Sequence, residues 1–266
     1  MKLVATDLDG TLVRQDRTVS PRTIAVFRRL HESGVVIVLV TGRPIRWIAP
    51  VHSQLGLPAL AICANGAATY DPATDTIVHS APLEADILAQ ACARLRAEVP
   101  GVVFAVERDG GRQMRHEPGF PVGPWEADQE SVGPATLAEI LTRPAAKLLV
   151  RAGVQAPDEF TARVGACLTG LAEATNSSSS GMVEVSAAGV TKATALARVA
   201  RTNAVDPADV IAFGDMPNDL PMLTWAGRGV AMANAHPAVR AAASDVTKHS
   251  HEEDGVAEYL ERVFGF

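Results

Sequence analysis

Short apolar runs alternate with helix-like segments in the first third of the chain. The apolar runs, typical of parallel strands that are covered on both faces, are Leu3–Thr6, Val35–Val40 and Ala59–Cys63. Between the first two, Pro21–His31 predicts a helix, because Ser20 can cap its first turn and proline suits its first position. Another helix is expected to begin near Pro44. This alternation predicts an α/β fold with a doubly wound, Rossmann-like parallel sheet.

The last third of the chain resumes the same alternation. The expected strands are Val210–Phe213 and Gly229–Met232, and the expected helices are Thr191–Arg201, Asp219–Trp225, Ala238–Ala243 and Glu253–Val263. We therefore expect both ends of the chain to contribute to one sheet.

The middle of the chain contains more Pro, Gly and Arg. Its expected strands are Val102–Glu107, Lys147–Arg151 and Met182–Ser186, and its expected helices are Leu83–Glu98 and Asp158–Leu171. Residues 107–133 have little periodicity and are expected to form loops, whereas Ser177–Ser180 fits either a linker or a polar strand or turn. We infer an α+β cap domain of residues 83–186, inserted into a catalytic core of residues 1–82 and 187–266.

Composition and charge exclude several classes of protein. The 266 residues carry a net charge of −6, which gives no basic footprint for nucleic acid. Apolar runs are too short to span a bilayer, and the first one meets Asp7 at once, which leaves no room for a signal peptide, so the cytoplasm is the expected location. Cys63, Cys92 and Cys167 form no CxxC pair, so neither a zinc site nor a redox pair is expected.

Polar residues that could bind a ligand or take part in a reaction follow several of the expected strands. Asp7 and Asp9 come directly after the first strand, and carboxylates at i and i+2 point to the same side of an extended chain. Gly10 would let the backbone turn close to a ligand. An Asp-Gly turn with solvated acids is the alternative reading of this fragment.

Two further loops and one lysine could also bind a ligand, although each has an ordinary structural alternative. Thr41-Gly42-Arg43 could hold an anion before a helix, or simply cap that helix. The loop of residues 214–219, Gly-Asp-Met-Pro-Asn-Asp, could bring acids to a hard cation such as magnesium, or form an ordinary turn. Lys192, one of four lysines, opens an expected helix, although a lone lysine is usually solvated.

Taken together, these loops and Lys192 predict a single binding site at one edge of the sheet. Loops that follow parallel strands meet at one edge of a sheet, which would gather Asp7, Asp9, Asp215 and Asp219 in a small volume. Four neighbouring carboxylates raise one another's pKa, and a divalent cation with an ammonium such as that of Lys192 would relieve the repulsion. A cation, an amine, a hydroxyl and an activated carboxylate suit phosphoryl transfer.

At this point the chain resembles the haloacid dehalogenase superfamily. The resemblance is carried by DLDGT at residues 7–11, TGR at 41–43, Lys192 and GDMPND at 214–219, in that order. The run Ala64-Asn65-Gly66-Ala67 and the insertion of about a hundred residues after it resemble the Cof-type phosphatases, subfamily IIB. The inserted domain matches in position and size only.

The resemblance implies roles for the acidic residues. Asp7 would be the nucleophile that takes the phosphoryl group, and it would also bind Mg²⁺. Asp9 would protonate the leaving alcohol and then activate water, with its backbone carbonyl on the metal. Thr11 would orient Asp9, Asp215 would be the third protein ligand to Mg²⁺, and Asp219 would hold a metal-bound water.

The resemblance also implies a phosphate site. Thr41, the Gly42 backbone, Lys192 and Asn218 would bind the phosphoryl group, and Lys192 would in addition neutralise Asp7.

The expected function is a Mg²⁺-dependent phosphomonoester hydrolase acting on small phosphorylated metabolites, sugar phosphates first and phosphorylated cofactor precursors next. A phosphomutase of the same superfamily and a non-catalytic phosphometabolite-binding protein are the alternatives; binding alone does not need Asp9. Partners other than the metabolite, in particular nucleic acid or membrane, are not expected, and the oligomeric state is left open.

Substrate specificity is expected to come from the cap. Candidate side chains, each of which could equally be an ordinary surface or packing residue, are Arg46, Trp47, Glu184 and an Arg or His within residues 108–116. His249 and His251 precede a further family-like run, Asp254-Gly255-Val256, and are expected at the surface because no metal-ligand spacing supports them.

Overall fold

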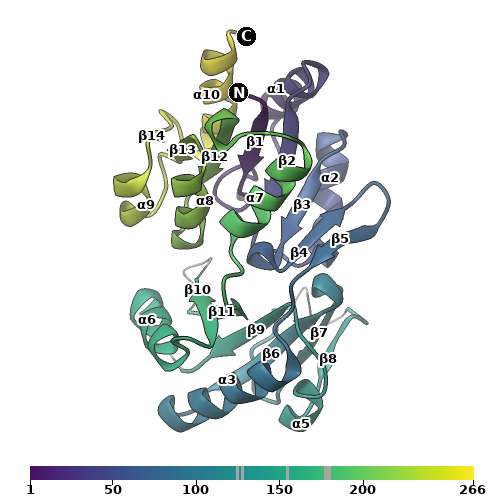
Figure 1. Cartoon of the computed structure of the whole chain (residues 1–266), viewed down its shortest axis with the longest axis vertical. Coiled ribbons are helices and arrows are strands. Elements are labelled where there is room, and N and C mark those ends of the chain that lie inside the picture. Colours follow the sequence, from purple (N-terminus) through teal and green to yellow (C-terminus); the bar gives the residue numbers. More distant parts are fainter. Residues whose placement is uncertain (124–125, 127–128, 154–155, 177–180) are drawn as a thin grey trace.

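The strands form a large and a small sheet in the part of the chain that the computed structural model describes, which is residues 1–123, 126, 129–153, 156–176 and 181–266 (Figure 1). The large sheet contains, in spatial order, β14 (Asp245–Val246), β13 (Arg228–Ala231), β12 (Val210–Gly214), β1 (Leu3–Thr6), β2 (Val36–Val40), β3 (Leu60–Cys63), β4 (Ala68–Asp71) and β5 (Thr76–Ser80). The small sheet contains β10 (Ala172–Thr175), β11 (Val183–Ala187), β9 (Lys147–Arg151), β6 (Val103–Arg108), β7 (Gln113–His116) and β8 (Val132–Pro134).

The large sheet is parallel from β14 to β3, and β4 and β5 add an antiparallel edge. Its central strand, β1, is buried along its whole length, as its apolar sequence requires. The neighbours of β1 are β2, from the start of the chain, and β12, from its last quarter. The strand order therefore reverses at β1, and open α/β sheets bind ligands beside the carboxyl ends of the strands at such a point.

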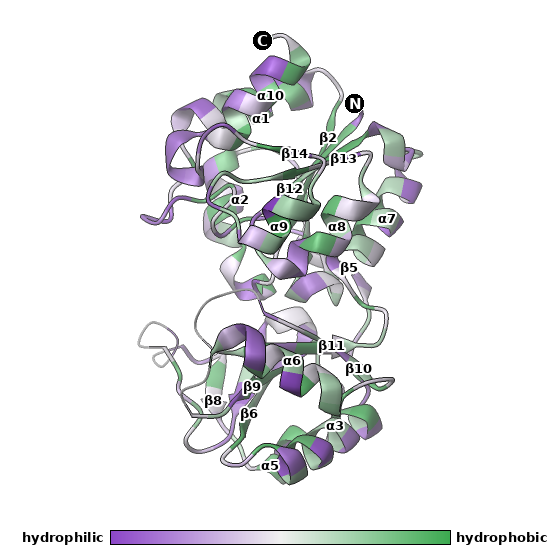
Figure 2. Cartoon of the chain, turned by 90° about the vertical axis from the view of Figure 1, so that its left-hand side faces the viewer, coloured by the Kyte–Doolittle hydropathy of each residue, from purple (hydrophilic) through white to green (hydrophobic). Residues whose placement is uncertain are grey.

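Helices cover both faces of the large sheet (Figure 2). One group comprises α1 (Pro21–Glu32), α2 (Ala49–Leu55) and α10 (Gly255–Phe264), and the other comprises α7 (Lys192–Thr202), α8 (Leu220–Trp225) and α9 (Pro237–Ala242). The first helix begins as its sequence predicts, because Ser20 accepts a hydrogen bond from the backbone N–H of Thr23 at 3.0 Å. These layers confirm the doubly wound α/β core.

The small sheet has one apolar and one mixed face. Phe104, Val106, Leu148 and Val150 pack into a second apolar cluster with α3 (Ala85–Glu98) and α6 (Pro157–Cys167). The short helix α5 (Leu137–Ile140) adds to the same cluster. Because side chains alternate along a strand, the intervening residues of β6, β9 and β11 lie on the opposite face, which looks toward the large sheet (Figure 1).

The structure differs from the expected elements mainly in the middle of the chain. The segment expected to be loops, residues 107–133, contains β7 and β8, and β7 pairs with β6 in antiparallel register. The strands β4, β5 and β10 were not expected either. The sequences of these strands lack the continuous apolar run that marks β1 and β3, and the strands form by pairing with their neighbours, so the sequence pattern does not reveal them. Near Pro44 there is only a single 3₁₀ turn, Ile45–Trp47, before α2.

Three further expectations concern the domain boundaries, the cysteines and membrane-spanning helices. The division into a core and a cap at residues 83 and 186 stays a prediction, and Ser177–Ser180 lie outside the described residues. The three cysteines are free thiols. Among the described residues, no helix is both long and apolar enough to cross a membrane.

The fold predicts that Gly229 in β13 tolerates no side chain. A Cβ there would lie 2.0 Å from the backbone oxygen of Leu223, in α8, so helix and strand would have to separate. We expect Gly229→Ala to lower the free energy of unfolding by about 2–3 kcal/mol, as overpacking does. In the control variant Gly34→Ala the new Cβ meets open space and the cost is only the positive φ of 81°, about 1 kcal/mol. Urea unfolding measures both, and a Gly229→Ala protein as stable as Gly34→Ala would contradict the close packing.

Candidate active site

Asp7 stands at the carboxyl end of the central strand β1, where its side chain is buried. Beyond it the chain curls, because the backbone N–H groups of Leu12 and Val13 donate to the carbonyl of Leu8 at 3.0 and 2.8 Å. The chain is therefore curled rather than extended beyond Leu8, and Asp7 and Asp9 both line the pocket between the two sheets. The carboxylate of Asp9 forms a two-pronged contact with Arg43, in which Nε lies 2.7 Å and Nη2 lies 2.5 Å from its oxygens.

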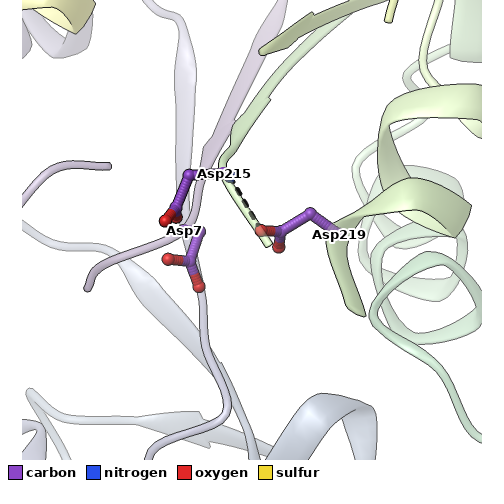
Figure 3. Close-up of side chains that lie close together, drawn as sticks. All are labelled: Asp7, Asp215 and Asp219. Atoms are coloured by element: carbon purple, nitrogen blue, oxygen red, sulfur yellow. Dashed lines mark hydrogen bonds between the residues drawn. The ribbon is translucent and has the colours of Figure 1, made fainter. Parts of the chain in front are cut away.

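Three of the four expected acids do meet. Asp7, Asp215 and Asp219 each place a carboxylate oxygen within 4.8 Å of the others, and all three are buried (Figure 3). They come from the end of β1, the end of β12 and the turn that leads into α8. Segments from opposite ends of the chain thus converge at the carboxyl edge of the sheet, as the spacing predicts.

Lys192 is the cation of this cluster. It is the first residue of α7, only 1% of its side chain is exposed, and its Nζ lies 2.6 Å from Oδ1 of Asp7 and 2.6 Å from Oδ1 of Asp219. Asp219 also accepts hydrogen bonds through Oδ2 from the backbone N–H groups of Asp215 and Met216, at 3.0 Å each. Both oxygens of Asp219 are therefore engaged, and it holds Lys192 in place beside Asp7.

Burial sets the protonation behaviour of the cluster. Burial raises the pKa of Asp7 well above its ordinary value, and the nearby carboxylates add to this while Lys192 opposes it. Burial and Asp219 raise the pKa of Asp215 to about 7. Burial would lower the pKa of Lys192, but Asp219 and Asp7 outweigh it and raise that pKa. The ammonium therefore stays charged, and it does not fully compensate the acids.

The donor set fits a divalent cation. Three carboxylates against one ammonium leave two negative charges, which one divalent ion neutralises. Hard cations prefer carboxylate and carbonyl oxygens. Gly10 keeps the place beside Asp215 clear: its φ is +81°, and a Cβ there would lie 2.3 Å from Oδ2 of Asp215. Asp7 and Asp215 are the acids best able to bind such an ion, since Asp219 is already fully hydrogen bonded.

Thr11 lies next to the cluster but not in the expected contact. The resemblance implied that it orients Asp9, whereas its hydroxyl donates to Oδ1 of Asp215 at 2.8 Å. The hydroxyl of Thr11 therefore orients Asp215.

The expected phosphate-site residues surround the same edge. Thr41 is buried and its Oγ1 accepts a hydrogen bond from the backbone N–H of Arg43 at 3.0 Å. Asn218 is buried, and its Nδ2 donates to Oδ1 of Asn65 at 3.1 Å, which leaves the second N–H of that amide for another acceptor. Gly42 and Asn218 both line the pocket described next.

A pocket of about 830 Å³ opens between the two sheets, with Asp7 and Asp9 on its large-sheet side. Arg46, Trp47 and Glu184, three of the expected specificity candidates, line it. Arg108 points elsewhere, because its Nη2 donates to the carbonyls of residues 139 and 140. His251 was expected at the surface, but its side chain is only 13% exposed and lines the pocket.

Three polar residues of the site were not assigned a role from the sequence. Arg43 binds Asp9, Asn65 binds Asn218, and Lys147 contacts Glu184 and the carbonyl of Gly42. Arg43 and Asn65 belong to runs that carried the family resemblance. The available signal for Lys147 was a charged residue opening an otherwise apolar strand, in a chain with few lysines.

Comparisons with known proteins agree with this geometry. The family model of haloacid dehalogenase-like hydrolases matches residues 4–260. The chain is 30% identical over 268 residues to the 5-amino-6-(5-phospho-D-ribitylamino)uracil phosphatase YitU of Bacillus subtilis, with 98% of this chain and 97% of the relative covered. It is 31% identical over 273 residues to the HMP-PP phosphatase of Serratia proteamaculans, with 98% and 94% covered.

A solved structure shows the same fold. A haloacid dehalogenase-like hydrolase from Bacteroides thetaiotaomicron superposes with a TM-score of 0.77 at 26% identity, over 99% of each chain. The motif order, the convergence of the acids and the match along nearly the whole chain lead to one conclusion: this chain is an enzyme of the haloacid dehalogenase-like hydrolase family.

Proposed function

We propose that this enzyme hydrolyses phosphomonoesters of small metabolites, with Asp7 as the nucleophile and Mg²⁺ as the cofactor. The observation that carries the proposal is the contact of Lys192 with Asp7, inside a buried acid cluster of which Asp7 lines the pocket. Lys192 opposes the rise in the pKa of Asp7 that burial and the neighbouring carboxylates cause, and its positive charge also attracts a phosphate dianion.

In the first step, an oxygen of Asp7 attacks phosphorus, and the bond between phosphorus and the alcohol oxygen breaks. Asp9 gives its proton to that oxygen, and the phosphoryl group remains on Asp7. In the second step, Asp9 takes a proton from a water molecule that attacks the same phosphorus, which releases inorganic phosphate and restores Asp7.

Asp7, Asp215 and the backbone carbonyl of Asp9 would hold Mg²⁺, which supplies charge stabilisation to the transferring phosphoryl oxygens when it is bound. Thr41, the Gly42 backbone, Lys192 and Asn218 would bind those oxygens, and Asp219 keeps Lys192 in place.

The pair between Asp9 and Arg43 adds a condition to this scheme. Both oxygens of the Asp9 carboxylate accept hydrogen bonds from the same guanidinium, which fixes the direction in which the side chain points. The Asp9 side chain, which is 58% exposed, has to turn from Arg43 to reach a leaving group in the pocket.

The substrate is a small phosphorylated metabolite. The relatives support this class, since their names specify phosphatases of a ribitylaminouracil phosphate and of HMP-PP. Within the class we propose sugar phosphates and phosphorylated cofactor precursors, which a screen of phosphorylated metabolites with Mg²⁺ would separate. Conversion of a sugar phosphate into an isomer without release of inorganic phosphate would instead indicate a mutase.

Replacing the nucleophile tests the proposal directly. Asp7→Asn should abolish release of phosphate from p-nitrophenyl phosphate while the circular dichroism spectrum stays unchanged, because the amide cannot attack phosphorus. The control Asp86→Asn changes an exposed acid of α3 in the same way and should keep wild-type turnover. Equal residual turnover in the Asp7→Asn variant and the wild type would leave a binding protein as the better description.

Replacing Asp9 tests general acid–base help. Asp9→Asn should slow hydrolysis of alkyl phosphates by roughly a hundredfold or more. The loss should be smaller for p-nitrophenyl phosphate, whose leaving group needs no proton. Steady-state rates on both esters measure the difference, and wild-type rates on the alkyl ester would rule out the role of Asp9.

The raised pKa of Asp215 predicts how Mg²⁺ binding depends on pH. Without the ion, the folded protein keeps a proton on Asp215 up to about pH 7, whereas the unfolded chain loses it near 3.8, so stability falls as pH rises between these values. Mg²⁺ replaces that proton, and its stabilising effect should therefore be larger at pH 8 than at pH 5.5. Thermal unfolding with and without Mg²⁺ measures this. In Asp215→Asn the shift should be small at both pH values; a shift in the wild type that ignores pH would count against the assignment.

A further inference from the structure

A second buried ion pair lies across the pocket from the acid cluster. Lys147, on β9, donates from Nζ to Oε1 of Glu184, on β11, at 2.7 Å. The two side chains are 1% and 5% exposed, and both lie on the face of the small sheet that looks toward the large sheet. A buried ion pair is costly to desolvate and adds little stability by itself, so its other contacts indicate what it does.

Lys147 reaches across to the loop after β2. Its Nζ donates to the carbonyl of Gly42 at 2.6 Å. That carbonyl belongs to the same peptide group as the N–H of Arg43, which donates to Oγ1 of Thr41 at 3.0 Å. One ammonium on the small sheet therefore fixes the orientation of a peptide in the proposed phosphate loop.

Glu184 reaches the other side of the same site through Asn65. Its Oε2 accepts a hydrogen bond from Nδ2 of Asn65 at 2.7 Å, and Oδ1 of Asn65 accepts one from Asn218 at 3.1 Å. The backbone N–H of Asn65 donates to the carbonyl of Thr41 at 3.1 Å. Asn65 has φ = 56°, a left-handed conformation that asparagine tolerates better than most residues. It is therefore the hub that joins Glu184 to both phosphate-site loops.

We propose that Lys147 and Glu184 are positioning residues, which use the small sheet to hold the loop of residues 41–43 and, through Asn65, the side chain of Asn218 in the geometry that binds the phosphoryl group. This inference rests on the proposed function, because it takes those two loops as the phosphate site. It assigns a role to Asn65, which the sequence marked only by resemblance.

Two other roles for Lys147 and Glu184 predict different effects of substitution on phosphate binding. If Lys147 and Glu184 acted through their charges, removal of Glu184 would tighten phosphate binding, and removal of both charges together would leave it unchanged. If they contacted the leaving group, inorganic phosphate would bind as before, because it has no leaving group.

The decisive variant is therefore the double substitution Lys147→Met with Glu184→Leu. It replaces both charges by apolar side chains of similar size, so neither partner of the pair stays buried without the other. The buried Glu107 loses the nearby charge of Lys147 but keeps Arg46 as its counter-charge at 3.1 Å, and the protein should fold. We expect the Mg²⁺-loaded double variant to bind inorganic phosphate about tenfold more weakly than the wild type, as measured by the broadening of the phosphate signal in phosphorus NMR. Wild-type affinity in the folded double variant would overturn the proposal.

Glu184→Gln keeps the test decisive even if the double variant does not fold. The amide retains one acceptor oxygen, which can serve Lys147 or Asn65 but not both, so phosphate binding should weaken by less than in the double variant. Tighter binding in this variant would overturn the positioning role and indicate charge repulsion instead.

Arg112→Gln is the matched control. Arg112 also links the two sheets, through an ion pair with Asp75 at 2.7 Å, but the side chains are 37% and 68% exposed and the pair lies outside the Lys147–Asn65 network. Its loss should change phosphate affinity by less than about twofold. These affinities need no turnover, whereas the proposed function fails only if wild-type hydrolysis does not depend on Asp7, so the two failures are distinguishable.

Discussion

The ammonium of Lys192, held between the carboxylates of Asp7 and Asp219, is the interaction on which the site depends. Burial and the neighbouring carboxylates raise the pKa of Asp7 and Lys192 opposes this rise, and the proposed nucleophile must be ionised to attack phosphorus. The helix α7 delivers the lysine from its first turn, and the backbone N–H groups of residues 215 and 216 hold its second partner. The strand order places β12 beside β1 and so brings the loops that carry Asp7 and Asp219 close enough for both to contact Lys192.

The sequence was informative wherever a strong local signal agreed with the fold. Apolar runs such as Leu3–Thr6 predict buried parallel strands, and Ser20-Pro21 marks the start of α1 to the residue. Since parallel strands end at one edge, the positions of the polar loops along the chain were enough to predict that Asp7, Asp215 and Asp219 would meet. Family motifs added the pairing of Lys192 with Asp7, which residue types alone did not specify.

What the sequence did not reveal depends on local curvature and on contacts between distant strands. The chain curls through hydrogen bonds to the carbonyl of Leu8, and Asp9 pairs with Arg43, 34 residues further along; no periodicity rule anticipates either feature. Lys147 looked like the edge of an apolar strand, because its partners Gly42 and Glu184 lie far from it in sequence. The short strands β7 and β8 form for the same reason, through pairing with neighbours that a linear pattern does not show.

The placement of β12 beside β1 has a consequence for biosynthesis. The ribosome makes Asp7, the proposed nucleophile, 185 residues before Lys192, and the acids at residues 215 and 219 follow later still. Until then the middle of the sheet has an open flank, and Asp7 is an isolated carboxylate without a counter-charge. A chain that stops before residue 192 therefore lacks the charged partner of Asp7, and the site is complete only when the two segments that flank β1 and β12 have joined.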